Sequence, residues 1–281
     1  MPGQAPRSPA TGPESSRFDF YGAQYARFAG ELAKEMRREV YGVDLGQQGW
    51  RTAAEEAEIA DLLHCRPDVD VLDIACGSGG PSLALVERTG CRLTGIDVEP
   101  GAIAYAQAQA AVRGLASGVT FAAHDCGGRL PFADGAFDAV LCVDAINHFD
   151  DRFAVLSEWS RLLRRGGRLL FTDPLVMTGA VSRDELVIRA SLGFYLFVPP
   201  GLNEKAIAAA GLTLVRCEDR TAAAAEIAAR WHEARARRAD LLEREEGAAF
   251  FGQRQRFLAT TAALAASGRL SRFLYAAEKS A

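Results

Sequence analysis

Hydrophobic positions along this chain follow two alternating rhythms, one typical of short buried strands and one typical of helices. After Pro67, apolar runs of strand length are separated by segments with helical spacing. We expect strands at 69–75, 92–96, 119–123, 137–143 and 168–172, and helices from about 80 to 88, at 100–113 and at 152–163. Strands that alternate with helices in this way predict βαβ units and a parallel sheet with helices on both faces.

The flanking segments are richer in helical patterns. Helices are expected at 18–40, 52–64, 182–192, 203–210, 221–244 and 248–267, and strands at 212–217 and 272–278. Residues 1–16, rich in Pro, Gly, Ser and Ala, predict a disordered tail. We therefore expect an N-terminal cap helix and loop at 17–50 and a core at 51–281. Two cap insertions, at about 174–200 and 221–267, would cover the active site.

Composition narrows the class of protein. The chain has 281 residues, 49% of them hydrophobic, and a formal net charge of −4. A protein that grips phosphate backbones usually carries a basic surface, so no nucleic-acid partner is expected. No signal peptide and no apolar run long enough for a membrane span are recognisable, which predicts a soluble cytoplasmic protein. A monomer and a homodimer both remain open.

Cysteine and histidine spacing argues against a metal site. The 6 cysteines form no CxxC pair, and the 4 histidines do not fall at the spacings of metal ligands. Several cysteines lie inside apolar runs, where a free thiol behaves as a small buried hydrophobe. We therefore expect no bound metal.

The segment Asp73–Gly80 (DIACGSGG) joins the first core strand to a helix. Glycines at this position allow the backbone to approach a ligand, and open α/β sheets bind ligands at the carboxyl ends of their strands. The third glycine of the dinucleotide fingerprint is missing, and the carboxylate of Asp73 precedes the loop. A pyrophosphate would be repelled by that charge, whereas an ammonium group would be attracted.

Two further acids end the next two strands. Asp97 can accept hydrogen bonds from both hydroxyls of a ribose, and Asp125 can accept from an adenine amino group. Asp97 alone would also suit a nicotinamide dinucleotide. The three acids together predict sites for an ammonium group, a ribose and an adenine.

These segments, together with 130–132, 137–140 and 162–172, resemble the ordered motifs of class I S-adenosylmethionine-dependent methyltransferases. The resemblance implies an α/β fold with a seven-stranded Rossmann-like sheet, whose last strand, near 273–276, is antiparallel. S-adenosyl-L-methionine would be the cofactor, and Ala75 stands where the family often has glycine. The implied cofactor residues are the loop positions Asp73, Ala75, Gly77 and Gly79, the ribose ligand Asp97 with Val98, the adenine contacts Asp125 and Cys126, and Cys142 facing the methionine part.

The segment after the fourth strand, Val143–Asp151, leaves the sheet where the methyl group would lie. Asp144 and His148 are four residues apart and would share a face on a helical turn, and histidine is a suitable proton acceptor near neutral pH. The segment resembles the Asp-Ala-Ile/Phe-Leu-His stretch of sarcosine/dimethylglycine and phosphoethanolamine N-methyltransferases, although Asn147 replaces a usually apolar residue. We expect Asp144 and His148 to be catalytic, and the substrate to contact Tyr25, Trp50, Asn147, Phe194 and Tyr195.

The predicted function is direct, in-line methyl transfer from S-adenosylmethionine to a small molecule, with an amine acceptor slightly favoured. The alternative is a C- or O-methyltransferase of a prenyl, quinone or other apolar natural-product intermediate, because the run 192–200 is strongly apolar. A nicotinamide-dependent oxidoreductase and a non-catalytic binding subunit with the same fold are the competing classes.

Overall fold

A computed structural model describes residue 25 and residues 27–280. Its seven strands form one sheet in the order β3-β2-β1-β4-β5-β7-β6. The strands are β1 (Asp70–Ile74), β2 (Arg92–Asp97), β3 (Val119–Ala123), β4 (Phe137–Cys142), β5 (Leu163–Met177), β6 (Leu212–Asp219) and β7 (Leu270–Lys279). Neighbours from β3 to β5 are parallel, and β7 runs antiparallel to both β5 and β6. The predicted seven-stranded α/β sheet, including its antiparallel last strand, is confirmed.

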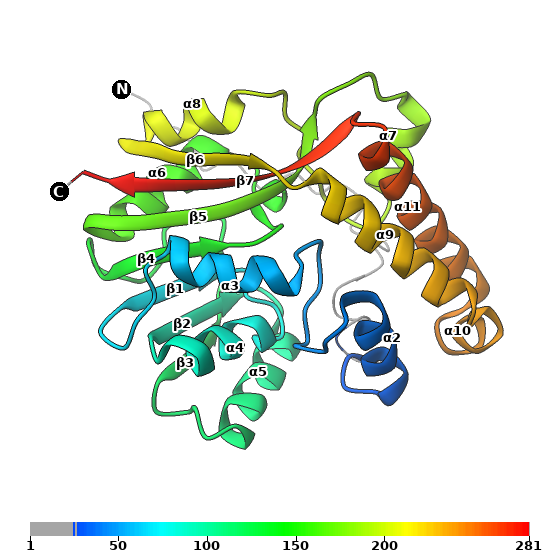
Figure 1. Cartoon of the computed structure of the whole chain (residues 1–281), viewed down its shortest axis with the longest axis horizontal. Helices are drawn as coiled ribbons and strands as arrows, with labels where there is room; N and C mark the ends of the chain where they lie inside the picture. Colours follow the sequence, from blue (N-terminus) through cyan, green and yellow to red (C-terminus); the bar gives the residue numbers. More distant parts are fainter. Residues whose placement is uncertain (1–24, 26, 281) are drawn as a thin grey trace, which may run out of the picture.

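Helices cover both faces of this sheet (Figure 1). On one face, α3 (Ala53–Leu62), α4 (Gly80–Thr89) and α5 (Pro100–Val112) pack on a core that includes Ile59, Leu83 and Ile103. On the other face, α6 (Arg152–Leu162) and α8 (Leu202–Ala209) pack on a core that includes Trp159 and Ile207. The sheet is thus buried on both sides, which explains why its parallel strands are nearly continuous apolar runs.

The remaining helices gather beyond the carboxyl ends of the parallel strands (Figure 1). They are α2 (Glu31–Tyr41), the 3-10 turn η1 (Ile146–His148), α7 (Arg183–Arg189), α9 (Thr221–Ala236), α10 (Ala239–Glu246) and α11 (Ala248–Ala266). A third apolar cluster joins α2, α9 and α11 through Val40, Ile227 and Phe257, with Trp50 and Leu192. We call α9, α10 and α11 the cap helices.

Three predicted elements differ from the observed ones. The expected helix 221–244 is divided into α9 and α10 at Arg237–Arg238, where Arg237 and Arg238 both pair with Glu39 of α2. Strand β5 is longer than expected because β7 pairs with it as far as Met177. The expected helix 18–40 is interrupted, because Tyr25 and Arg27 are helical, Phe28–Gly30 form a turn, and α2 then begins at Glu31. Residues 18–24 and 26, and the tail 1–16, lie outside the described residues.

Strand order fixes where a ligand can bind. After β1 the chain builds outward to β2 and β3, then returns to the other side of β1 to form β4. The connections after β1 and β4 therefore diverge and leave a crevice at the carboxyl ends of these strands. The glycine-rich loop after β1 and the Asp144–His148 segment after β4 both lie at this crevice.

Candidate active site

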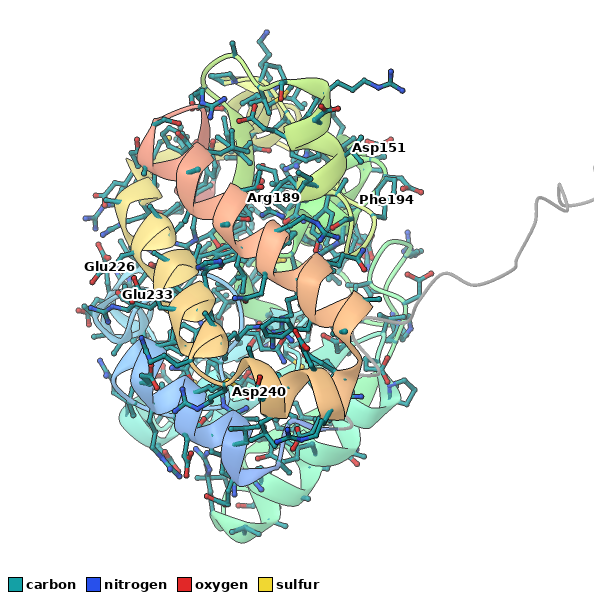
Figure 2. The ribbon with its side chains drawn as sticks, turned by 90° about the vertical axis from the view of Figure 1, so that its right-hand side faces the viewer. Asp151, Arg189, Phe194, Glu226, Glu233 and Asp240 are labelled. Carbon is teal, nitrogen blue, oxygen red and sulfur yellow. The ribbon has the colours of Figure 1, made fainter. Side chains whose placement is uncertain are left out.

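A cavity of about 1390 Å³ opens at the carboxyl ends of β1, β2 and β4. One half is walled by the loops that follow β1, β2 and β3, and we call it the cofactor half. The other half is walled by residues from 41–51, from 144–148, from 189–195 and from the cap helices, and we call it the acceptor half. Figure 2 shows Arg189 beside α11 and Phe194 further out on the same side.

The glycine-rich loop is held under a second loop, residues 42–51. Ser78 Oγ donates a hydrogen bond to the carbonyl oxygen of Gly46 over 2.7 Å. A Cβ added to Gly80 would lie 1.6 Å from the carbonyl oxygen of Leu45, so only glycine fits at this crossing. The loop therefore links the floor of the cofactor half to the acceptor half.

Asp73 brings a buried negative charge to this loop. Its side chain lines the cavity, and Ser82 Oγ donates to Oδ2 over 2.6 Å. Burial raises the pKa of Asp73 from 3.8 to about 6, despite the hydrogen bond from Ser82. A cation placed beside this carboxylate would relieve the cost of burying its charge, as the predicted ammonium site requires.

Asp97 fixes the other side of the loop. Oδ2 accepts from the Gly77 amide over 2.8 Å, and Oδ1 accepts from the Glu99 amide over 2.9 Å. Each carboxylate oxygen has a second acceptor position, so these bonds orient the group and leave capacity for two ribose hydroxyls. Val98, which is exposed, continues the wall beside it.

The loop after β3 completes the cofactor half. Asp125 is exposed at the cavity, and its Oδ1 accepts from the Gly127 amide over 2.9 Å. Cys126 is buried, and its thiol donates to the carbonyl oxygen of His124. Both residues line the cavity, in positions compatible with the predicted adenine contacts.

Two residues predicted to contact the cofactor do not line the cavity. The Cys142 side chain is fully buried in the core beneath α6, because β4 directs it to that face, and the next residue, Val143, lines the cavity instead. Gly79 does not line the cavity either. A Cβ there would lie 2.7 Å from Ala106 and Phe121, so this glycine permits close packing of α4 on α5 and β3.

Tyr25 lies over the cofactor loop, although we had expected it to contact the substrate. A Cβ on Gly77 would be 2.6 Å from its hydroxyl oxygen, and its ring packs against Phe28 at 5.5 Å. Burial, and then the charge of Asp97, raise its pKa well above the usual value. We therefore group Tyr25 with the cofactor residues.

Asp144 is engaged by the protein on both oxygens. Oδ2 accepts from the Trp50 amide over 2.7 Å, and Oδ1 accepts from Thr172 Oγ1 and from Arg272 Nε, each over 2.7 Å. Arg272 in turn makes a two-pronged ion pair with Glu55 of α3, at 2.7 and 2.9 Å. These bonds anchor the loop 42–51 to the sheet, so the geometry favours a positioning role for Asp144 over direct contact with the acceptor.

His148 lines the acceptor half at the end of η1. Its Nδ1 lies 2.8 Å from the carbonyl oxygen of Phe194, and its ring lies 5.0 Å from that of Tyr195. Because a carbonyl can only accept, Nδ1 carries the proton and Nε2 is the basic nitrogen. Burial, and then the charge of Arg189, lower the pKa of His148 below 6.5, so the ring is neutral near pH 7.

The other predicted substrate residues also line the cavity. Trp50 and Asn147 are buried, Tyr195 is partly buried and Phe194 is half-exposed. The backbone carbonyl of Asn147 accepts from the Leu196 amide over 2.8 Å, which ties η1 to the 192–198 segment. These contacts bring together segments that are about 50 residues apart in the sequence.

Sequence reasoning missed a cationic and aromatic wall. Arg189 of α7 is buried, with its guanidinium carbon 4.6 Å from the ring centre of Phe257, 5.3 Å from Tyr195 and 5.9 Å from Trp50. Arg254 of α11 also lines the cavity, and burial lowers its pKa to about 9. Neither arginine belongs to a sequence motif described above. The arrangement could be found only from the packing of the cap.

Metal ligation and membrane insertion find no support within the described residues. No group of three or more His, Cys, Asp or Glu side chains there could hold a metal ion. No helix there is both long and apolar enough to cross a bilayer.

Comparison with known proteins agrees with this geometry. Residues 72–171 match the family model described as a methyltransferase domain. Methyltransferase GfsG of Streptomyces halstedii is 35% identical over 128 residues, which are 44% of this chain and 46% of that protein. Phosphoethanolamine N-methyltransferase 3 of Arabidopsis thaliana is 30% identical over 164 residues, 58% of this chain and 33% of its own length.

The fold extends beyond the matched segment. The structure of phosphoethanolamine N-methyltransferase 2 of Haemonchus contortus, in complex with phosphomonomethylethanolamine and S-adenosylhomocysteine, superposes with a TM-score of 0.76. It is 18% identical and covers 94% of this chain and 61% of that one. The chain spans half or less of the length of the two curated relatives named above. Its fold is that of this solved methyltransferase structure, and residues 72–171 match a methyltransferase domain, as the sequence motifs predicted.

Proposed function

We propose that this protein transfers a methyl group from S-adenosylmethionine to a small molecule bound in the acceptor half of the cavity. The observation that carries the proposal is that two groups of side chains with different chemistry line one cavity. A buried carboxylate, Asp73, and two acids at strand ends, Asp97 and Asp125, line one half. A neutral histidine, His148, lines the other.

The residues of the cofactor half fit S-adenosylmethionine. Asp73 would pair with its ammonium group, Asp97 would accept from the ribose hydroxyls, and Asp125 with Cys126 would bound the adenine. When bound, the cofactor supplies an electrophilic methyl group on a positively charged sulfur. The protein's own task is then to align an acceptor with that methyl group and to receive a proton if the acceptor carries one.

We propose that the acceptor atom is a hydroxyl oxygen, with His148 Nε2 as the base. The field of Arg189 lowers the pKa of His148, and the same positive field stabilises an oxygen that loses its proton. It would disfavour a cationic amine. The carboxylate of Asp144, the group expected to orient an amine, already accepts three hydrogen bonds from the protein.

Methylation of an amine or of carbon is the alternative, and the expected slight preference for an amine comes from the sequence pattern around Asp144 and His148. A zwitterionic acceptor, such as an amino acid, would place its own carboxylate in the positive field of Arg189. The aromatic rings of Trp50, Tyr195 and Phe257 offer apolar surface to any of these acceptors.

Mass spectrometry of reaction mixtures tests the proposal. The purified chain and S-adenosylmethionine are incubated with phenols, aliphatic alcohols, amines, amino acids and prenyl diphosphates, and products are scored for the mass of one added methylene group. We expect hydroxyl compounds to be methylated. Methylation of amines alone would overturn the choice of acceptor atom, and no transfer to any compound would overturn the proposed activity.

A further inference from the structure

The side chain of Asn147 is a polar group buried at the cavity. Asn147 is 1% exposed, and its Oδ1 has no hydrogen-bond partner among the residues that the structure describes. Its backbone carbonyl is bonded to the Leu196 amide, so the turn is held by the main chain and does not need the side chain. The residue lines the cavity on the same 3-10 turn as His148.

A buried carboxamide oxygen without a donor carries the cost of its lost hydration, and native proteins keep few such atoms. An apolar side chain would avoid that cost. Ser191, which also lines the cavity, has a buried hydroxyl that likewise lacks a partner within the described part of the chain. Two unsatisfied polar atoms on one cavity point to a ligand that supplies their hydrogen bonds.

We propose that Asn147 is a specificity-determining residue that binds a polar group of the acceptor. That group is a hydroxyl or an N–H close to the atom that receives the methyl group, because the neighbouring residue on the turn, His148, is the base. Ser191 provides a second hydrogen-bonding atom for the same polar acceptor. A purely hydrocarbon chain, such as the body of a prenyl compound, would leave both atoms unsatisfied and is selected against.

This inference rests on the proposed function and names the kind of acceptor that it takes. The chain offers a matched control for it. Asn203 of α8 is also 1% exposed, but its side chain donates to Asp173 Oδ2 over 2.8 Å and accepts from Arg152 over 3.1 Å. Replacing Asn203 breaks hydrogen bonds of the folded protein, whereas replacing Asn147 removes an oxygen that has no hydrogen-bond partner among the described residues.

The experiment compares Asn147→Leu, Asn203→Leu and wild type by thermal unfolding, by calorimetric titration with S-adenosylhomocysteine, and by methyl-transfer kinetics. The acceptors are tested in pairs that differ by one hydroxyl next to the reactive one, such as catechol and phenol, and ethanolamine and ethylamine for N-methylation. We expect Asn147→Leu to unfold at or above the wild-type temperature and Asn203→Leu to unfold clearly below it. The Kd for S-adenosylhomocysteine of Asn147→Leu should stay within about twofold of wild type.

For the acceptor pair that wild type methylates, kcat/KM for the compound with the extra hydroxyl should fall about 10- to 100-fold in Asn147→Leu. For the partner that lacks it, kcat/KM should change little. If Asn147→Leu loses stability as Asn203→Leu does, or keeps the wild-type preference between the two compounds, the inference is overturned. If the wild-type protein methylates no compound, the proposed function is overturned, and this inference with it. That outcome differs from failure of the inference alone, because it is already seen before any residue is replaced.

Discussion

The two halves of the cavity are built in different ways. Every side chain of the cofactor half except Tyr25 comes from one stretch of sequence, between Asp73 and Gly128, and from loops that directly follow strands. The acceptor half is assembled from five separate segments, which include a loop, a 3-10 turn, the residues after α7 and two cap helices. The cofactor half is thus set by local sequence and strand order, whereas the acceptor half depends on how distant helices pack.

The two halves also differ in how a buried carboxylate is accommodated. In the cofactor half, Asp73 is a carboxylate whose pKa is raised to about 6 by burial. In the acceptor half, Asp144 is a buried carboxylate that is paired with Arg272 at 2.7 Å. We therefore propose different roles for these two acids at the ends of adjacent strands, ligand binding for Asp73 and architecture for Asp144.

Replacing His148 should have the largest effect on turnover. His148→Ala removes the proposed base, and loss of a general base typically costs a factor of about 10² to 10⁴ in kcat. Steady-state kinetics with a hydroxyl acceptor from the screen measure it. In wild type, kcat should be constant above about pH 7 and should fall at acidic pH as the ring protonates, below the ordinary histidine pKa of 6.5. Wild-type turnover in His148→Ala would remove this residue from the mechanism.

Breaking the ion network under the acceptor half should have the largest effect on stability. Arg272→Met leaves the carboxylates of Glu55 and Asp144 buried without their cation, and we expect a loss of about 3–5 kcal/mol in the free energy of unfolding. Arg92→Met is the control, because Arg92 pairs with Asp70 at the surface, where solvent screens the interaction, and its loss should be much smaller. Urea unfolding of both variants measures the difference. Equal losses would mean that the network does not support the acceptor half.

Replacing Asp73 should raise the stability of the apoprotein and weaken cofactor binding. Its folded pKa of about 6 lies above the unfolded value of 3.8, so the ionised carboxylate destabilises the apoprotein above pH 6 and this cost disappears as the pH falls toward 4. Asp73→Asn should therefore be more stable than wild type by about 2–3 kcal/mol at pH 8, with a smaller gain at pH 5. Urea unfolding at the two pH values checks it.

The same substitution should weaken cofactor binding. Calorimetry should find a Kd for S-adenosylhomocysteine at least ~10-fold higher in Asp73→Asn at pH 8, because the ammonium group loses its charged partner. A less stable variant with unchanged affinity would contradict the assigned role.

The smallest effect concerns the backbone of the cofactor loop. Ala75 adopts a left-handed conformation, with φ 58°, which costs a residue with a Cβ about 1–2 kcal/mol. Ala75→Gly should relieve this cost, partly offset by the greater entropy of glycine in the unfolded chain, for a net gain of up to ~1 kcal/mol. Thermal unfolding would detect the gain as a higher Tm. A lower Tm would mean that packing of the Ala75 methyl group outweighs the strain.

Most residues that the sequence predicts for the cofactor half line the cavity, because their motifs follow strands whose order is fixed by the βαβ pattern. The exceptions concern the direction of single side chains, since Cys142 points into the core and Gly79 serves packing. In the acceptor half, the predicted residues His148 and Trp50 line the cavity, but the sequence did not indicate Arg189 or the network of Asp144, Arg272 and Glu55. Those contacts span up to 217 residues of sequence, and no local pattern records them.

The most direct test of this division is calorimetric titration with S-adenosylhomocysteine of one variant from each half. Asp97→Ala removes the predicted ribose ligand, and its Kd should rise ~10-fold or more. His148→Ala lies in the acceptor half, and its Kd should stay within about twofold of wild type. Unchanged affinity in Asp97→Ala, or a comparable loss in His148→Ala, would contradict the division of the cavity into a cofactor half and an acceptor half.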